Sequence, residues 1–236
     1  MKYKKIVFLL LLNFLSTNTA NSAISLDRTR AIYDGSNKAI SLNISNENKQ
    51  LPYLAQAWIE DKDMVKITEP LVVTPPIQRV EPATKSMIRI STLPKIDSLP
   101  QDKETLFYFN LREIPPRSDK PNVMQIALQT KIKLFYRPTS IKTKPGEVWQ
   151  NKLILTEENN GYNIENPTPY YITVANISAK GSNQKNTQFV PILIEPKSHL
   201  KITSEVYDSP VVTYINDYGG RPSLNFQCKQ KTCLAE

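Results

Sequence analysis

Short runs rich in β-branched and aromatic residues recur along the chain, and Pro, Asn, Asp and Gly separate them. Runs of this length and spacing are typical of all-β sandwiches. The chain holds 18 prolines and 6 glycines, which fits many strand ends and rigid connections, because proline cannot donate a hydrogen bond inside a sheet. The predicted strands are 39–44, 53–60, 71–74, 86–91, 105–113, 123–137, 152–157, 161–165, 170–178, 189–195, 199–205, 211–215 and 223–228.

A domain boundary is expected at 138–146, PTSIKTKPG, which follows a strong strand and lacks a periodic apolar pattern. Each half then holds about seven strands, the number in a simple immunoglobulin-like sandwich. The Cys…Trp…Cys spacing of antibody domains is absent from both halves. The sequence therefore predicts immunoglobulin-like domains at 23–140 and 141–236.

The first 22 residues are predicted to be a secretory signal. Lysines at 2–5 precede an apolar run at 6–15, and small residues at Ala20 and Ser22 precede a cut between Ser22 and Ala23. The apolar run is too short to span a bilayer comfortably. We expect a soluble, exported mature protein.

The charge balance gives no indication of nucleic-acid binding. The formal net charge is +8, and removing the three signal lysines leaves +5. The remaining basic residues are scattered, and an exported protein seldom meets nucleic acid. We expect no nucleic-acid partner.

No motif of catalysis or cofactor binding stands out. His199 is the one histidine, and no nucleophile-elbow motif accompanies it. One histidine and one cysteine pair leave no soft-ligand cluster for a metal. Gly219 and Gly220 lie in a turn without a phosphate-loop pattern. We expect no enzyme activity, no catalytic residue, no cofactor and no metal.

Cys228 and Cys233 lie close together near the C-terminus. In an oxidising compartment such a pair is most simply a disulfide. A redox-active pair normally has two intervening residues and a helix start, and neither is present. A ring this small contributes roughly 2 kcal/mol, so it is expected to staple a terminal hairpin.

The predicted strand 123–137 has an unusual apolar pattern. Met124, Ile126 and Leu128 fall on one face at the two-residue period of a strand. At the edge of a sheet, such a strand is a template for pairing with another chain.

Arg30 and Lys133 are two basic residues beside apolar strand positions. One interpretation is that both side chains extend from strand ends into solvent. The other is that they form a paired cationic site for one carboxylate.

Three segments, SLDRTR at 25–30, NLREIPP at 110–116 and KIKLFYRP at 131–138, resemble the periplasmic pilus-assembly chaperones. The likeness also covers QLPYLAQAWIE, IENPTPYY and YINDYGGRP, so it runs through the mature chain. The resemblance implies a periplasmic protein of two immunoglobulin-like domains set in an L, with a cleft between them.

The resemblance also implies roles for single residues. Arg30 and Lys133 match the family's anchor for the C-terminal carboxylate of a pilus subunit. Met124, Ile126 and Leu128 match the alternating residues that fill the groove of an incomplete subunit.

Glu104, Arg137 and Asp217 match the family's buried interdomain ion network.

The orientation of Lys133 is open at this stage. On an ideal strand, Lys133 points away from the face of Met124, Ile126 and Leu128. Twist or a bulge between Leu128 and Lys133 would reconcile them. Otherwise the anchor and the apolar residues face different directions.

The function implied is the capping of pilus subunits, pilins and adhesin, by a donated strand, without catalysis. An outer-membrane assembly platform is the further partner expected, and self-association of the free protein is left open. The alternative is an exported β-sandwich adhesin or pilus structural subunit, which would need a carbohydrate pocket or its own donor extension.

Overall fold

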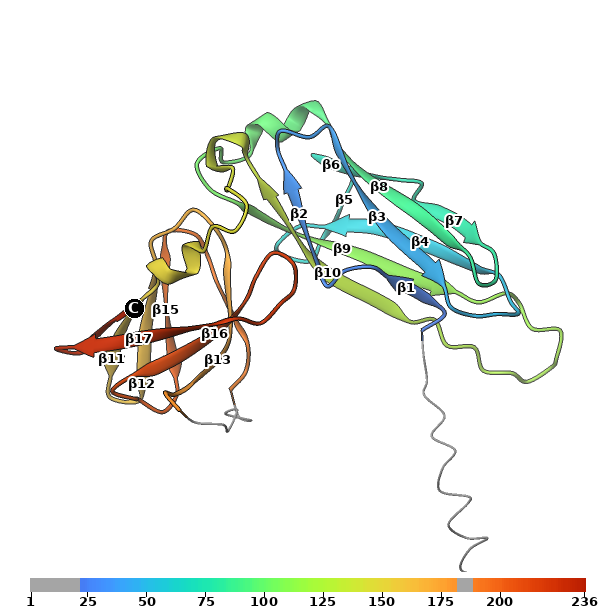
Figure 1. The fold of residues 1–236 in the computed structure, drawn as a ribbon. Coiled ribbons are helices and arrows are strands. Elements are labelled where there is room, and N and C mark those ends of the chain that lie inside the picture. Colours follow the sequence, from blue (N-terminus) through green and yellow to red (C-terminus); the bar gives the residue numbers. More distant parts are fainter. Residues whose placement is uncertain (1–21, 182–188) are drawn as a thin grey trace, which may run out of the picture.

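The computed structural model describes residues 22–181 and 189–236. Residues 1–21 of the predicted signal lie outside this range. Within the described residues the strands form three sheets, two in the first half of the chain and one in the second (Figure 1). Strands β2 (Arg30–Asp34) and β10 (Gln129–Arg137) pair in parallel, whereas the other strand pairs are antiparallel. No helix in this part of the chain is long and apolar enough to cross a lipid bilayer.

The first half packs two sheets around one core. The smaller sheet has the order β1 (Ile24–Leu26), β3 (Ala39–Asn46), β8 (Lys85–Thr92) and β6 (Leu71–Thr74). The larger has the order β2 (Arg30–Asp34), β10 (Gln129–Arg137), β9 (Thr105–Ile114), β4 (Tyr53–Glu60) and β5 (Lys66–Ile67), with β7 (Ile77–Val80) also paired to β4.

Alternation along these strands builds the core between the two sheets. On β8, Ile88 and Ile90 are buried while Met87 and Arg89 face solvent, as the two-residue period of a strand requires. Phe109 of β9 is fully buried in the same cluster.

The second half forms one continuous sheet that folds over its own core. Its order is β14 (Ile192–Ile194), β13 (Ile172–Ala179), β16 (Pro210–Ile215), β17 (Ser223–Lys229), β18 (Thr232–Ala235), β11 (Ile154–Glu158), β12 (Gly161–Asn166) and β15 (Ser198–Thr203). The start of β17 pairs with β16 and its end pairs with β18. This strand therefore joins the two layers around a core that includes Trp149, Tyr162 and Phe226.

Three short 3-10 helices complete the described elements: η2 (Pro94–Ser98), η3 (Thr139–Ile141) and η4 (Trp149–Lys152). The predicted domain boundary at 140/141 falls within η3, in the connection between the two halves.

The predicted strand 123–137 is too long at its start. Strand β10 begins at Gln129, and residues 123–128 are not in a strand. The physical reason is the lack of a partner edge: β9 ends at Ile114, and the amide of Glu113 bonds the carbonyl of Leu128 at 3.0 Å where the pairing ends. A segment whose residues favour a strand does not form inter-strand hydrogen bonds when no neighbouring strand lies beside it.

The all-β prediction is confirmed, and the two halves meet through the β16–β17 loop, red in Figure 1. Gly219 in this loop has φ +83°, and a Cβ there would lie 2.5 Å from Thr29 Oγ1 of the first half. Glycine at position 219 therefore allows the loop to lie close to Thr29 and also allows the left-handed backbone conformation.

Candidate functional site

Strand β10 presents two chemically different faces. Ile132, Leu134 and Tyr136 belong to the core of the first half. Lys133 and Phe135 point the other way. The register with β9 runs without a shift from Gln129 to Tyr136, so no bulge lies between Gln129 and Lys133. Lys133 therefore faces away from the even-numbered residues of β10.

Arg30 and Lys133 are brought together by the parallel pairing of β2 and β10. They are direct register partners, and partners in a sheet project their side chains from the same face. Arg30 is only 8% exposed, and its NH1 donates to the carbonyl of Ile215, 3.2 Å away in the second half. Its Nε is buried without a partner among the described residues.

The two cations share an unfavourable electrostatic environment. Burial lowers the pKa of Lys133, and the positive charge of Arg30 lowers it further. Burial also lowers the pKa of Arg30, against the opposite effects of Asp217 and Glu104. Neither cation belongs to an ion pair within the described ranges. An anion placed between them would offset both the burial of the two cations and the repulsion between them.

A hollow of about 380 Å³ lies beside Arg30, between the two halves of the molecule. Its lining residues are Asp27, Arg28, Arg30, Ile32, Asp217 and Tyr218. Tyr218 is 90% exposed at this position. The hollow opens onto the Arg30 side chain, whereas Lys133 is not among its lining residues.

The structure brings Glu104, Arg137 and Asp217 together. Arg137 Nε donates to Glu104 Oε1 at 2.8 Å, and Arg137 NH1 donates to Asp217 Oδ2 at 2.9 Å. Arg137 and Glu104 are buried at 5% and 3% exposure. Because Glu104 and Arg137 belong to the first half and Asp217 to the second, the guanidinium joins the two halves.

Burial raises the pKa of Glu104 to about 7, against the opposing effects of Arg137 and of a backbone hydrogen bond. That bond comes from the amide of Tyr171, 2.7 Å from Glu104 Oε2. The Arg137 guanidinium also lies over the rings of Trp149 and Tyr170, at 4.9 and 5.0 Å from the ring centroids. The network is thus packed as well as hydrogen-bonded.

The apolar segment that precedes β10 faces solvent. Met124, Ile126 and Leu128 are 86%, 68% and 46% exposed. Every residue from 123 to 129 is exposed, so the segment has no buried face. Met124, Ile126 and Leu128 do not touch the core of the first half, so their apolar surface is free to contact another molecule.

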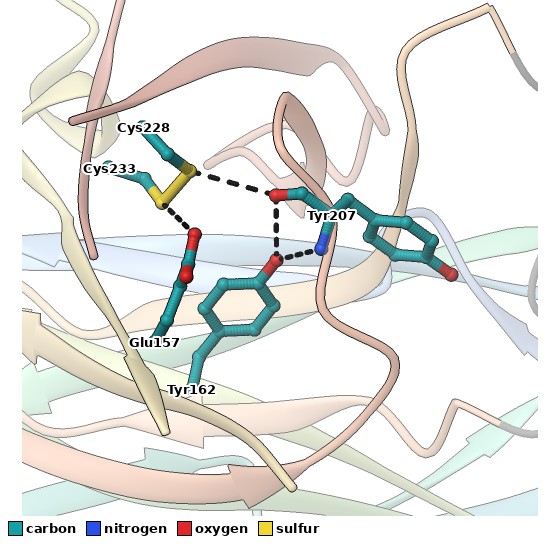
Figure 2. Close-up of a disulfide and its surroundings, with 5 residues drawn as sticks. All are labelled: Glu157, Tyr162, Tyr207, Cys228 and Cys233. Carbon is teal, nitrogen blue, oxygen red and sulfur yellow. Dashed lines mark hydrogen bonds between the residues drawn. A yellow bond between two sulfur atoms is a disulfide. The ribbon is translucent and has the colours of Figure 1, made fainter. Parts of the chain in front are cut away.

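The predicted disulfide joins Cys228 and Cys233 directly across the β17–β18 hairpin. In Figure 2 the Glu157 carboxylate lies 3.9 Å from Cys233 Sγ, and the Tyr162 hydroxyl accepts a hydrogen bond from the amide of Tyr207 at 2.7 Å. Glu157 and the two sulfurs are the one metal-like donor group within the described residues. Sulfurs bonded to each other are not thiolate ligands.

Sequence reasoning missed several contacts at this junction. Thr143 Oγ1 accepts from Arg137 NH1 at 2.9 Å, and Phe135 packs on Tyr171 with ring centroids 5.4 Å apart. The odd-numbered spacing of Lys133, Phe135 and Arg137 was the available signal, because it places all three on one face of β10.

Family models match both halves of the chain. Residues 23–142 match the model described as "Pili and flagellar-assembly chaperone, PapD N-terminal domain". Residues 148–226 match the model described as "Pili assembly chaperone PapD, C-terminal domain".

Curated relatives and solved structures agree with these matches. The chain is 59% identical over 215 residues to the chaperone protein PapD of Escherichia coli, covering 91% of this chain and 90% of that protein. It is 44% identical over 219 residues to the probable fimbrial chaperone YfcS of Escherichia coli K12, covering 92% and 88%. The Salmonella enterica SafB chaperone, solved in complex with the SafA pilin, gives a TM-score of 0.75 at 25% identity, with 89% of this chain and 98% of that chain covered. The two sandwiches are immunoglobulin-like chaperone domains, and the chain belongs to the PapD family of pili assembly chaperones.

Proposed function

We propose that this chaperone caps pilus subunits by holding the subunit's C-terminal carboxylate between Arg30 and Lys133 and lending it the segment 123–128 as a strand. The observation that carries the proposal is the register pairing of two partly desolvated cations, neither of which belongs to an ion pair among the described residues. A terminal carboxylate supplies one negative charge and can accept from both donors.

The anchor sets the register of the donated strand. Once the carboxylate is fixed at Lys133, the subunit edge is aligned with the residues that precede β10. A slip of one residue would turn every side chain to the other face. Met124, Ile126 and Leu128 then enter the subunit groove together, and each buried side chain contributes roughly 1.5–3 kcal/mol before ordering costs.

The backbone of residues 123–128 supports this role. These residues are not in a strand, and their exposed apolar side chains lack a covering surface among the described residues. A subunit that lacks its last strand offers both the hydrogen-bonding edge and the apolar groove. Pairing would extend β10 toward residue 123 on the subunit.

The family and the fold support the remaining parts of the proposal. Residues 23–140 and 141–236 act as two domains, and the ion network around Arg137 fixes their junction. The chaperone works in the periplasm after loss of residues 1–22, binds pilins and adhesin without catalysis, and delivers them to an outer-membrane platform. Because the relatives are chaperones, this function is preferred to an exported adhesin or structural subunit.

Competition with synthetic peptides tests the anchor. A chaperone–subunit complex, formed by co-expression and purified from periplasm, is challenged with the subunit's C-terminal peptide as a free acid or as an amide. The free acid should displace the subunit at a lower concentration than the amide. Equal competition by both peptides would contradict the carboxylate anchor. Failure of the chaperone to co-purify with any pilus subunit would contradict capping itself.

A further inference from the structure

Glu113, near the end of β9, is a buried carboxylate without a cation. Its side chain is in a residue only 5% exposed. Its Oε2 accepts hydrogen bonds from Ser22 Oγ at 2.8 Å and from the amide of Ile24 at 2.9 Å. Within residues 22–181 and 189–236, none of the ion pairs includes Glu113. Buried charges in proteins are normally paired, so this site lacks a positive charge.

The Ser22 hydroxyl has two neighbouring acceptors but only one proton to donate. Ser22 Oγ lies 2.8 Å from Glu113 Oε2 and 2.9 Å from the carbonyl oxygen of Ile24. A hydroxyl has one proton to donate, whereas a primary ammonium has three. An ammonium at this place could therefore donate to both acceptors and neutralise the carboxylate.

The predicted signal cut creates such an ammonium. The match to the N-terminal family model begins at residue 23. Hydrolysis of the Ser22–Ala23 bond by a signal-processing peptidase consumes one water, leaves a carboxylate on Ser22 and leaves an amine on Ala23. That amine is mostly protonated at neutral pH, since an ordinary α-amino group has a pKa of about 7.7–8.0.

The new amine is held close to Glu113 by the chain itself. Covalent geometry keeps the nitrogen of Ala23 within about 4 Å of the nitrogen of Ile24, which bonds Glu113 Oε2. Ala23 is 8% exposed, and its carbonyl accepts from the amide of Glu47 at 2.7 Å. Departure of Ser22 vacates the position of its hydroxyl without freeing Ala23.

We propose that Glu113 is the binding site for the α-ammonium of Ala23, so that removal of the signal completes a buried ion pair. The backbone amide of Glu113 donates a hydrogen bond to the carbonyl of Leu128, at the end of the exposed apolar segment. Cleavage would thus fix the chain terminus beside the segment that is proposed to enter the subunit. This proposal rests on the predicted cleavage site and not on subunit binding.

Other ionisable groups lie near the site. Glu47 and Tyr53 line the same hollow as Ala23 and Glu113. Hydrogen bonds from Ser45 and Ser25, and the positive charge of Lys85, lower the pKa of Glu47. The Glu47 carboxylate is already occupied by the hydroxyls of Ser25 and Ser45. Glu47 is therefore the matched control, a second carboxylate at the same hollow with other partners.

The experiment compares a chain that begins at Ala23 with one that begins at Ala20, each carrying Glu113 or Glu113→Gln. The α-amine of the Ala23 chain is titrated by amine-reactive labelling at several pH values and peptide mass spectrometry. Its pKa should lie at least one unit above the ordinary value, so labelling at pH 7.5 should be at least about sevenfold slower than in Glu113→Gln. Glu47→Gln should leave the labelling rate unchanged.

Thermal unfolding supplies a second readout. Glu113→Gln should lower the Tm of the Ala23 chain more than that of the Ala20 chain, whereas Glu47→Gln should affect both equally. Because the amine's folded pKa is raised, its stabilisation is present below about pH 8 and is lost as pH rises through the folded pKa.

Three results would overturn the proposal: an exported protein that does not begin at Ala23, an α-amine with an ordinary pKa, or labelling that Glu113→Gln does not change. If Glu113→Gln does not fold, the pKa of the wild-type amine decides alone. None of these readouts uses a subunit, so their failure leaves the capping proposal untouched.

Discussion

Arg30 on β2 and Lys133 on β10 are direct partners across the parallel strand pair of the larger sheet, and neither has an anionic partner among the described residues. Burial lowers the pKa of Lys133, and the neighbouring positive charge of Arg30 lowers it further, so two partly buried like charges side by side are unfavourable. Such an arrangement favours a bound anion over the empty site.

Removing either cation should abolish tight subunit binding while leaving the fold intact. Arg30→Ala and Lys133→Ala each delete a charged hydrogen-bond donor, worth about 1.5–3 kcal/mol, which weakens binding by roughly 10- to 150-fold. Titration calorimetry with a purified subunit measures the loss, and circular dichroism checks the fold. Lys201→Ala, which breaks an exposed pair with Glu158 in the second half, should bind like wild type. Wild-type affinity in both cation variants would refute the anchor.

A charge placed in the exposed apolar segment should weaken subunit binding without affecting folding. Ile126 is 68% exposed, so Ile126→Glu should fold and melt like wild type. Its binding should weaken more than tenfold, because burial of the isoleucine, worth roughly 1.5–3 kcal/mol, is lost and a charge would enter an apolar groove.

The matched control for Ile126→Glu is Met87→Glu. Met87 is 53% exposed on β8, in the other sheet of the first half. The Met87→Glu substitution should neither unfold the protein nor impair its protection of a subunit from aggregation, as followed by light scattering. Equal loss of protection in both variants would mean that residue 126 has no special contact with the subunit.

Truncating Arg137 should destabilise the protein strongly. Arg137→Ala leaves Glu104 buried beside Asp217 without their shared cation, and removal of one partner of a buried pair costs about 3–5 kcal/mol. Urea unfolding measures the change. Arg79→Ala breaks an exposed pair with Glu81 and should cost about 0–1 kcal/mol. The interpretation fails if both variants unfold at the same urea concentration.

The stability of the protein should depend on pH through Glu104. Burial raises the folded-state pKa of Glu104 to about 7, above the ordinary value of a glutamate, so the folded state binds more protons than the unfolded state between these values. The contribution of Glu104 to stability is therefore full below the unfolded pKa and falls as pH rises through about 7. Urea unfolding from pH 5 to pH 8 should show this decline in wild type and a shallower one in Glu104→Gln. Identical slopes in the two proteins would contradict it.

Local patterns in the sequence were enough to predict the all-β fold and most strands. The alternation in β4 and β8 survives in the structure, because each strand has neighbours on which its apolar face can pack. The disulfide was equally local, since Cys228 and Cys233 lie on the two arms of one hairpin. The alternation of Met124, Ile126 and Leu128 was a local signal as well. The ion network of Glu104, Arg137 and Asp217, in contrast, was predicted only from a resemblance to a family.

Only the tertiary structure decided where β10 begins and what surrounds its charges. Residues 123–128 have the pattern of a strand but no edge to pair with, and hydrogen-bond partners are not encoded in a segment's own residues. The juxtaposition of Arg30 with Lys133, and of Arg137 with Asp217, joins residues far apart in the sequence. Their pKa values and their energetic cost depend on burial and on neighbouring charges, and the packing of strands and domains sets both.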